Sequence, residues 1–278
     1  MPLTSGYAEM TNYEGRPVQL FDFNRGTIHW RYARADQDIM FRGELYEALP
    51  GIKDGGVQQN AAAGDNDVAI TVPDDSDIAQ LYVSNTPSDR MYITIWIYDL
   101  EAGPTDIGRM YWKGSVAGRA TGDSGSAQLN CQDLAVGFAR AGLRLSWERS
   151  CPHTLYDNQC MVDRTTFAVS GTLLSISGSA LQAAILGSFT DGWFAGGYCE
   201  WEIATGVFQR RGIESHIGSS VSVIGGLGGL APGSAVTFYP GCAHTSETCH
   251  SKFNNHLNYG GTPYMRGTSP FDGTPIFN

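Results

Sequence analysis

Basic residues are scarce in this chain and nowhere form a run. The 278 residues include 18 Lys and Arg against 28 Asp and Glu, which gives a formal net charge of −10. A protein that holds nucleic acid by its phosphates needs a basic surface, because the release of counterions drives that binding. Sequence-specific nucleic acid binding is therefore not expected.

Long hydrophobic runs are also missing. No stretch of 18 apolar residues occurs, so no membrane-spanning segment is expected. The N-terminus lacks the charged start and apolar core of a signal peptide. Six cysteines in a chain without an export signal suggest folding in a reducing compartment. Disulfides are then disfavoured, and paired cysteines favour metal binding.

What the sequence does have is β-type patterning. Thirty-five glycines and a hydrophobic content of 42% indicate a folded, turn-rich chain. The segment MYITIWIYDL, residues 91–100, carries the strongest strand signal. A short helix is expected after an N-cap at Ser76, and residues 134–150 fit either a helix or a bent strand. Residues beyond 241 are polar, lack periodicity and have too little apolar surface to fold against the body alone.

The predicted fold class is mainly β, with two domains of β-barrel or sandwich type and an irregular C-terminal segment. The first β domain is expected over residues 1–145 and the second over residues 165–240. A cysteine region, made of residues 146–164 and 241–278, is split by the second domain. Its two parts can meet only if the second domain begins and ends close together in space.

Two pairs of cysteines are the main candidates for a site. Cys151 and Cys160 have eight residues between them, and Cys242 and Cys249 have six. Structural zinc sites usually draw on tighter knuckles, with two to four residues between ligands. An iron–sulfur cluster is larger and accepts ligands from wider loops. By spacing alone, an iron–sulfur cluster, zinc and unligated thiols remain equally open, and disulfides are less favoured.

Other cysteines and histidines have simpler interpretations. His153, His244 and His250 lie beside the cysteines and could replace a ligand of zinc, but exposed loop histidines are commoner. Cys131 and Cys199 fall inside predicted strands, where cysteine behaves as a small buried apolar residue.

Signals of catalysis are weak, so the chain is not expected to be an enzyme. No GxSxG serine nucleophile occurs where a strand meets a helix, and no nucleophile signature surrounds any cysteine. The glycine-rich residues 225–233 lack the Lys and Ser/Thr of a phosphate-binding loop. A cell-envelope hydrolase with a cysteine nucleophile is kept as a less favoured alternative.

The cysteine segments with their flanks resemble the C-terminal region of tail-tip hub proteins of tailed phages. That family includes the tail-tip protein of lambda-like siphophages and the hub protein of gene transfer agents. The first matching segment is SWERSCPHTLYDNQC, residues 146–160. The second, GCAHTSETCHSKFNNHLNYGGTPYMRG, is the more specific, through Lys252-Phe253-Asn254-Asn255, Asn258-Tyr259, Gly261 and Pro263. The N-terminal half is similar in general character, with its QLFDF and RGELYEALP strands.

The resemblance implies a structural virion protein of a siphophage-like tail tip, folded and assembled in the host cytoplasm. It implies a homotrimeric hub that joins the sixfold distal tail protein ring to the central tail fibre or spike, so that two β domains per subunit present six modules to the ring. It also implies a [4Fe–4S] cluster held by Cys151, Cys160, Cys242 and Cys249. Zinc in a clipped β adaptor protein is the alternative.

The length of chain between the two cysteine pairs differs from that in the lambda-like proteins, in which a short link joins the pairs. Here about 80 residues separate Cys160 from Cys242. That longer arrangement is more similar to the gene-transfer-agent type.

Overall fold

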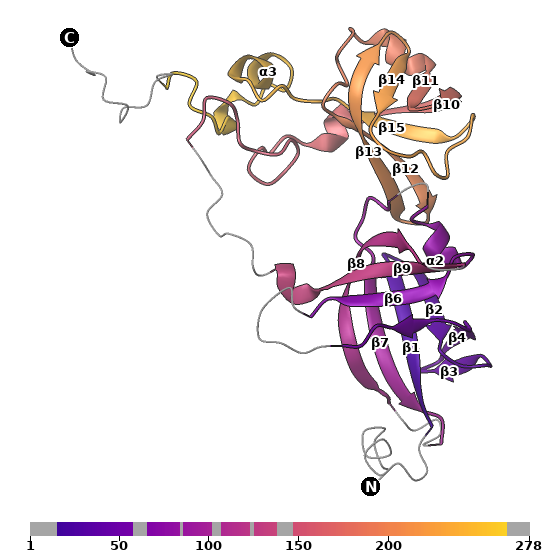
Figure 1. Cartoon of the computed structure of the whole chain (residues 1–278). Coiled ribbons are helices and arrows are strands. Elements are labelled where there is room, and N and C mark those ends of the chain that lie inside the picture. The colour runs from indigo at the N-terminus through magenta and orange to yellow at the C-terminus, as the bar shows by residue number, and fades with distance from the viewer. Residues whose placement is uncertain are drawn as a thin grey trace. The chain divides into compact units, whose positions relative to one another are not determined.

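A computed structural model of the chain describes residues 16–57, 66–83, 86–101, 107–122, 125–137 and 147–265. The chain divides into two compact units, and strands dominate both of them (Figure 1). Unit 1 comprises Met1–Arg140, Glu202–Gln209 and Gly226–Gly229, and unit 2 comprises Ala141–Trp201, Arg210–Gly225 and Leu230–Asn278. The prediction of a mainly β protein is confirmed.

Unit 1 contains a nine-stranded sheet in the order β3-β4-β2-β1-β7-β8-β9-β6-β5. Neighbouring strands are antiparallel except β2 and β4, which run parallel. The strands are β1 Pro17–Arg25, β2 Ile28–Ala33, β3 Ile39–Phe41, β4 Glu44–Ala48, β5 Lys53–Asp54, β6 Val68–Pro73, β7 Tyr92–Asp99, β8 Arg109–Thr121 and β9 Ser126–Asp133.

The sequence pattern explains why this sheet has a core. In β6 the side chains of Val68, Ile70 and Val72 are buried and alternate with half-buried neighbours, as the period of two requires. These residues pack with Phe21, Ile93 and others into one apolar cluster. The strand predicted over residues 91–100 is present as β7, and six of its eight residues are buried.

The short helices of unit 1 differ in part from expectation. Helix α2 spans Asp77–Gln80, directly after Ser76. Ser76 is the N-cap residue of α2, as expected, although its hydroxyl donates to the carbonyl of Pro73 and forms no side-chain cap bond. A 3₁₀-helix, η2, covers Leu134–Gly137, and the rest of the expected element up to residue 146 lies outside the described residues. Within the part of the chain that the structure describes, no helix is both long and apolar enough to cross a membrane.

A closed barrel of six strands follows, in the order β10-β11-β14-β13-β12-β15. Its strands are β10 Val169–Ser177, β11 Ala180–Ala183, β12 Tyr198–Ala204, β13 Val207–Ile217, β14 Ser220–Val223 and β15 Ala235–Tyr239, with 3₁₀-helices η3 Arg164–Phe167 and η4 Ala184–Ser188. Because the last strand, β15, pairs with the first, β10, the barrel begins and ends at one place. The segments on either side of the barrel therefore start from neighbouring strands.

The C-terminal segment contains helix α3, Ser246–Ser251, and a 3₁₀-helix η5, His256–Asn258. Its one large apolar anchor is Phe253, which is 7% exposed and packs against Cys160 and Val162. The expectation that this tail has too little apolar surface to fold against the body alone stays a prediction. The contact with Cys160 and Val162 depends on the single side chain of Phe253. A search for periodic apolar residues does not detect one isolated residue.

Candidate metal centre

The four paired cysteines meet in one cavity of unit 2. Cys151 and Cys160 come from the segment before the barrel, and Cys242 and Cys249 from the segment after it. All six cysteines of the chain are free thiols in the structure. The cavity is lined by Cys151, His153, Leu155, Cys160, Val162, Cys242, His244, Thr245, Cys249, Phe253 and Asn258. The expected convergence of the two segments is present, and their ligation of a metal stays a prediction.

The first segment is folded by an aspartate. The carboxylate of Asp157 accepts hydrogen bonds from the backbone N–H groups of Thr154, Gln159 and Cys160 at 2.6–3.1 Å. Desolvation opposes ionisation of this carboxyl, but the three amide donors outweigh it and hold the pKa of Asp157 below its usual value. The turn thereby sets the direction in which Cys160 leaves the loop.

The second segment places Cys249 on a helix. The Thr245 side chain accepts from the backbone N–H of Thr248 at 3.2 Å, which caps the N-terminus of α3, and Glu247 stands in its first turn. Cys249 is the buried residue of that helix. Sequence reasoning missed α3, although a threonine followed by an acidic residue in the first turn is a recognisable start signal.

Backbone hydrogen bonds join the two segments directly. The N–H of Cys151 donates to the carbonyl of His244 at 2.8 Å, and the His244 ring Nδ1 lies 3.0 Å from the carbonyl of Cys151. The hydroxyl of Tyr259 donates to the carbonyls of Arg149 and His244 at 2.7 and 3.2 Å. The two cysteine segments therefore form one connected structure.

Tyr156 attaches the first segment to the barrel. Its hydroxyl donates to the carbonyl of Pro240 at 2.9 Å, and its ring makes edge contacts with Tyr198, Tyr239 and Phe253. Burial raises the pKa of the Tyr156 phenol, so the group stays a neutral donor. The aromatic group of Tyr156 and its three partners ties together β12, β15 and both cysteine segments.

Lys252 fixes the end of α3 against the loops beside β12 and β15. Its ammonium donates to the carbonyls of Trp193 and Gly241 at 2.5 and 2.8 Å and stands 4.4 Å from the centroid of the Trp193 ring. Burial lowers the pKa of Lys252 to about 8, while the Cys242 sulfur opposes that shift. Both carbonyls and the ring favour the charged form, so the side chain is a cation at neutral pH.

Two glycines allow the backbone after β15 to approach the loop before β12. A Cβ on Gly241 would lie 1.9 Å from the carbonyl oxygen of Ala195, and one on Gly197 would lie 2.1 Å from that of Tyr239. No side chain fits at either position without a shift of the backbone. Cys242 follows directly, so this close approach sets where the third cysteine begins.

The four thiols differ in burial. Cys160 and Cys249 are 9% and 7% exposed, whereas Cys151 and Cys242 are half-buried. Desolvation raises the pKa of the Cys242 and Cys249 thiols, and the charges of neighbouring thiolates raise it further. A bound cation reverses that balance, because coordination deprotonates a thiol outright.

The donor set fits a thiolate-bound metal group. Four sulfurs and no carboxylate line the cavity, and thiolates favour zinc, Cu(I) and iron–sulfur clusters. Among the described residues, no three His, Cys, Asp or Glu side chains are grouped as a single ion would require.

The room inside the cavity is limited. The cavity offers about 10 Å³ of accessible space, which is room for about one water molecule. An iron–sulfur core is larger than this space. One feature of the lining favours a polar ligand in the cavity. The buried Nδ1 of His153 has no hydrogen-bond partner among the described residues.

The three candidate histidines and the two remaining cysteines differ in whether they line the cavity. His153 and His244 line the cavity, whereas the lining does not include His250, whose ring instead lies against that of His256. Cys131 in β9 and Cys199 in β12 are 2% and 0% exposed, and burial raises the pKa of each thiol to about 12. Their interpretation as buried apolar residues is confirmed.

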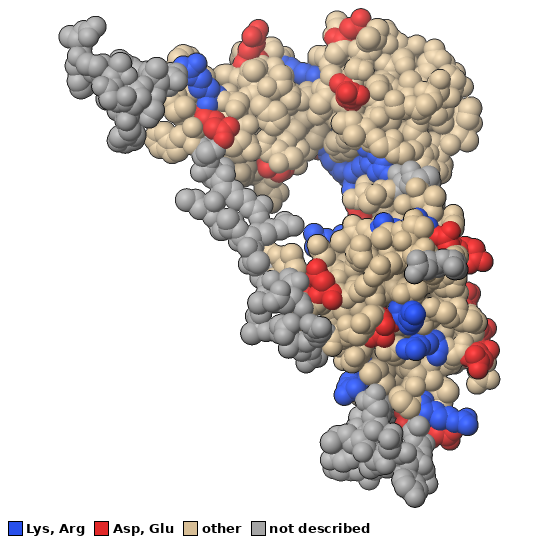
Figure 2. Space-filling model, in the orientation of Figure 1, with Lys and Arg blue, Asp and Glu red and all other residues tan. Residues whose placement is uncertain are grey.

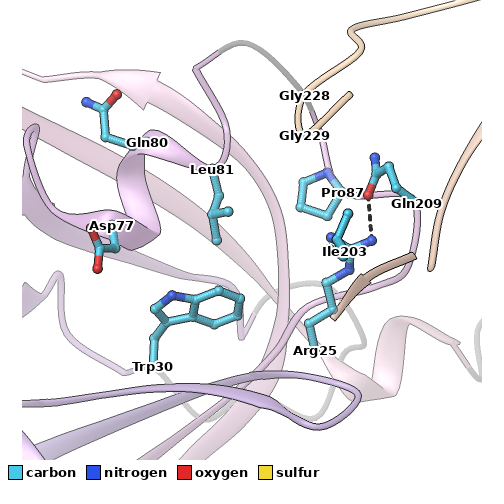
Figure 3. A pocket seen from close by; sticks show the side chains of 10 residues that line it. All are labelled: Arg25, Trp30, Asp77, Gln80, Leu81, Pro87, Ile203, Gln209, Gly228 and Gly229. Carbon is cyan, nitrogen blue, oxygen red and sulfur yellow. Dashed lines mark hydrogen bonds between the residues drawn. The ribbon is translucent and has the colours of Figure 1, made fainter. Parts of the chain in front are cut away.

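A separate pocket of about 490 Å³ lies in unit 1 (Figure 3). Trp30, Leu81 and Pro87 form apolar walls, and Gln209 accepts from Arg25 Nη2 at 2.5 Å. Neither cysteine pair lines this pocket.

Charged residues do not form one large field on the face shown in Figure 2. Acidic and basic side chains of the described residues lie there in small groups of both signs among uncharged ones.

Two protein families match this chain. Residues 21–163 match the family described as baseplate hub protein, N-terminal attachment domain, and residues 192–269 match the family described as phage conserved hypothetical protein BR0599. The first range contains Cys151 and Cys160, and the second contains Cys242 and Cys249.

Two individual proteins are also similar. A chain from a solved structure titled virion of native gene transfer agent (GTA) particle has a TM-score of 0.81 and 20% identity, with 98% of this chain and 95% of that chain covered. An uncharacterized protein of Xylella fastidiosa (strain 9a5c) is 35% identical over 166 residues, which are 53% of this chain and 32% of that protein. The match therefore spans about a third of that relative's length.

Proposed function

The chain belongs to the phage baseplate hub protein family, and from this premise we propose that it forms the trimeric hub of a tail tip, with a [4Fe–4S] cluster fastening its C-terminal segment. Membership of the family makes the protein a structural component of the phage tail. The trimer, its place in the tail and the cluster are the parts proposed.

The main support for the proposed cluster is the convergence of four cysteines on one cavity. Two of them precede the barrel and two follow it, yet all four line the same space. Thiols this close repel one another as thiolates, and a cationic iron–sulfur core offsets that repulsion. When bound, such a group supplies metal–thiolate bonds whose free energy adds to folding.

The chain's own contacts would prepare the site for the group. Asp157 folds the first loop, α3 presents Cys249, and Lys252 anchors the end of that helix. Cys151, Cys160, Cys242 and Cys249 would be the ligands. The role we propose is structural, since the cluster would link the C-terminal segment to the loop before the barrel.

The proposed trimer follows from the symmetry of a tail tip. A threefold hub beneath a sixfold distal tail ring has to present its contacts in sixes, and two β units per subunit supply that number. The two units differ, since one holds a nine-stranded sheet and the other a six-stranded barrel. We propose the distal tail protein ring on one side and a central fibre or spike on the other as partners.

Metal and sulfide analysis of the full chain tests the cluster. Protein purified without oxygen should be brown, with about four iron atoms and four sulfides per chain and a broad visible absorbance band. One zinc per chain without iron would select the zinc-clipped β adaptor instead. Protein that assembles into tails with neither metal would end both proposals.

The trimer has its own test. Light scattering of the purified chain, or imaging of assembled tails, should give three copies at the tail tip. A sixfold ring of this chain, or a position along the tail tube, would overturn the proposed placement and leave the cluster unaffected.

A further inference from the structure

A single residue, Asn255, connects both cysteine pairs. Its side-chain Nδ2 donates to the carbonyl of Cys160 and lies 3.9 Å from the Cys160 sulfur. Its backbone N–H donates to the carbonyl of Cys249 at 2.9 Å, and its own carbonyl accepts from the Cys249 thiol at 3.2 Å. Cys160 and Cys249 are also the two most buried thiols of the cavity.

The position of Asn255 in the chain makes these contacts unusual. It is the N-cap residue of η5, and the side chain of an asparagine at an N-cap ordinarily accepts a hydrogen bond from a backbone N–H of its own helix. Here its side chain makes no cap bond. The amide instead reaches about 95 residues back along the chain to Cys160.

The orientation of the amide is fixed from the other side. Asn258 Nδ2 donates to Asn255 Oδ1 at 2.6 Å, so the oxygen faces Asn258 and the N–H₂ group faces Cys160. An N–H dipole held beside a sulfur favours negative charge on that sulfur. Hydrogen bonds to the sulfurs are one of the factors that set the reduction potential of an iron–sulfur centre.

We propose that Asn255 is the positioning residue of the cysteine centre. It holds Cys160 through its side-chain amide and Cys249 through its backbone N–H, a bond that remains when the Cys249 thiol loses its proton to a ligand bond, and it raises the reduction potential of a cluster bound there. The inference rests on the proposed cluster. The redox event is the gain of one electron by the cluster from dithionite, and no bond to Asn255 forms or breaks. The reduced state carries one more negative charge, so the N–H group stabilises it more than the oxidised state.

The variants separate shape from hydrogen bonding. Asn255→Asp keeps the shape but replaces the N–H₂ donor by an acceptor, and Asn255→Ala removes the group. Asn254→Gly is the matched control, because Asn254 is an exposed neighbour with φ of 48° that glycine adopts without strain.

The experiment is an anaerobic redox titration of the full chain at fixed pH, followed by visible absorbance and EPR, with iron counted per chain. Asn255→Asp and Asn255→Ala should lower the midpoint potential, and Asn254→Gly should match the wild type. Loss of iron from the Asn255 variants, with the barrel still folded by circular dichroism, also supports a positioning role. Wild-type potential and full iron in both Asn255 variants would overturn it.

Metal-free protein gives a second readout. Limited proteolysis between Cys242 and Met265 should be several-fold faster in Asn255→Ala than in the wild type, because the side-chain bond from Asn255 to Cys160, one of the links between the segments, is lost. Equal rates would show that Asn255 does not hold them together. A wild-type protein that never contains iron would overturn both the proposed cluster and the proposed effect of Asn255 on its reduction potential. The proteolysis rates alone would then test whether Asn255 holds the two segments together.

Discussion

At the residue scale, the six cysteines form two classes that share a chemistry and differ in their surroundings. Four line one cavity, while Cys131 and Cys199 are buried in strands β9 and β12. This contrast supplies variants and controls within one chain.

Serine replacement should separate the two classes. Cys160→Ser or Cys249→Ser should abolish most iron binding and impair tail assembly, because each removes a proposed ligand. Cys199→Ser should retain iron, and its buried hydroxyl should lower the free energy of unfolding by about 1–3 kcal/mol. Iron content and chemical denaturation measure both effects. A cysteine nucleophile would give the reverse pattern, with hydrolysis lost in one variant and assembly intact.

Alkylation of the metal-free protein should follow burial. Iodoacetamide at pH 8 should label Cys151 and Cys242 first, since both are half-exposed. Cys131 and Cys199 should react roughly a hundredfold or more slowly, because burial raises their pKa to about 12 and only the thiolate reacts. Mass spectrometry of timed samples measures the order, and early labelling of Cys199 would contradict it.

At the element scale, the loops beside the barrel decide where the cysteines stand. The chain after β15 passes so close to the loop before β12 that only glycine fits at Gly197 and Gly241. Lys252 and Tyr156 then fasten α3 and the first loop to the same region.

Gly241→Ala should destabilise unit 2 by about 1–3 kcal/mol, because its Cβ would overlap the carbonyl oxygen of Ala195. Gly187→Ala is the matched control, since the nearest atom to its added Cβ is 3.9 Å away. Thermal unfolding of both variants measures the difference. Equal melting temperatures would mean that the backbone moves apart at little cost.

A polar contact inside unit 2 permits a second test. Glu200 is 7% exposed and accepts from the hydroxyl of Tyr239 at 2.6 Å and from Arg210 Nε at 3.0 Å. Tyr239→Phe should lower the free energy of unfolding by about 1–3 kcal/mol, because a buried carboxylate loses one donor. Denaturant titration measures it, and Ser170→Ala, which loses only an exposed hydroxyl contact, is the mild control.

At the scale of the whole molecule, removal of the metal should loosen the cysteine segments of unit 2 and leave the structure of unit 1 unchanged. Chelation should raise hydrogen exchange in residues 151–160 and 242–265, which the proposed cluster links, and leave the strands of unit 1 unchanged. Hydrogen exchange followed by mass spectrometry measures the protection of the cysteine segments and of the unit 1 strands separately. Equal loss of protection in both units would contradict a local structural role.

Much of the strand content followed from the sequence, because alternation of apolar and polar residues is a local property. It predicted β7 at its observed place. It missed β5, which has two residues, and β11, which has four, since such short strands depend on their partners. It also missed α3, whose burial rests on Cys249 alone.

The sequence by itself determined which residues are able to bind a soft metal, since donor chemistry belongs to the side chain. It also determined that the two pairs lie on loops on either side of a β domain. Only the tertiary structure decided that the pairs meet, because closure of β15 onto β10 returns the chain to its starting point. Asn255 likewise acquires its role only there, because its contact with Cys160 spans about 95 residues and no local pattern encodes it.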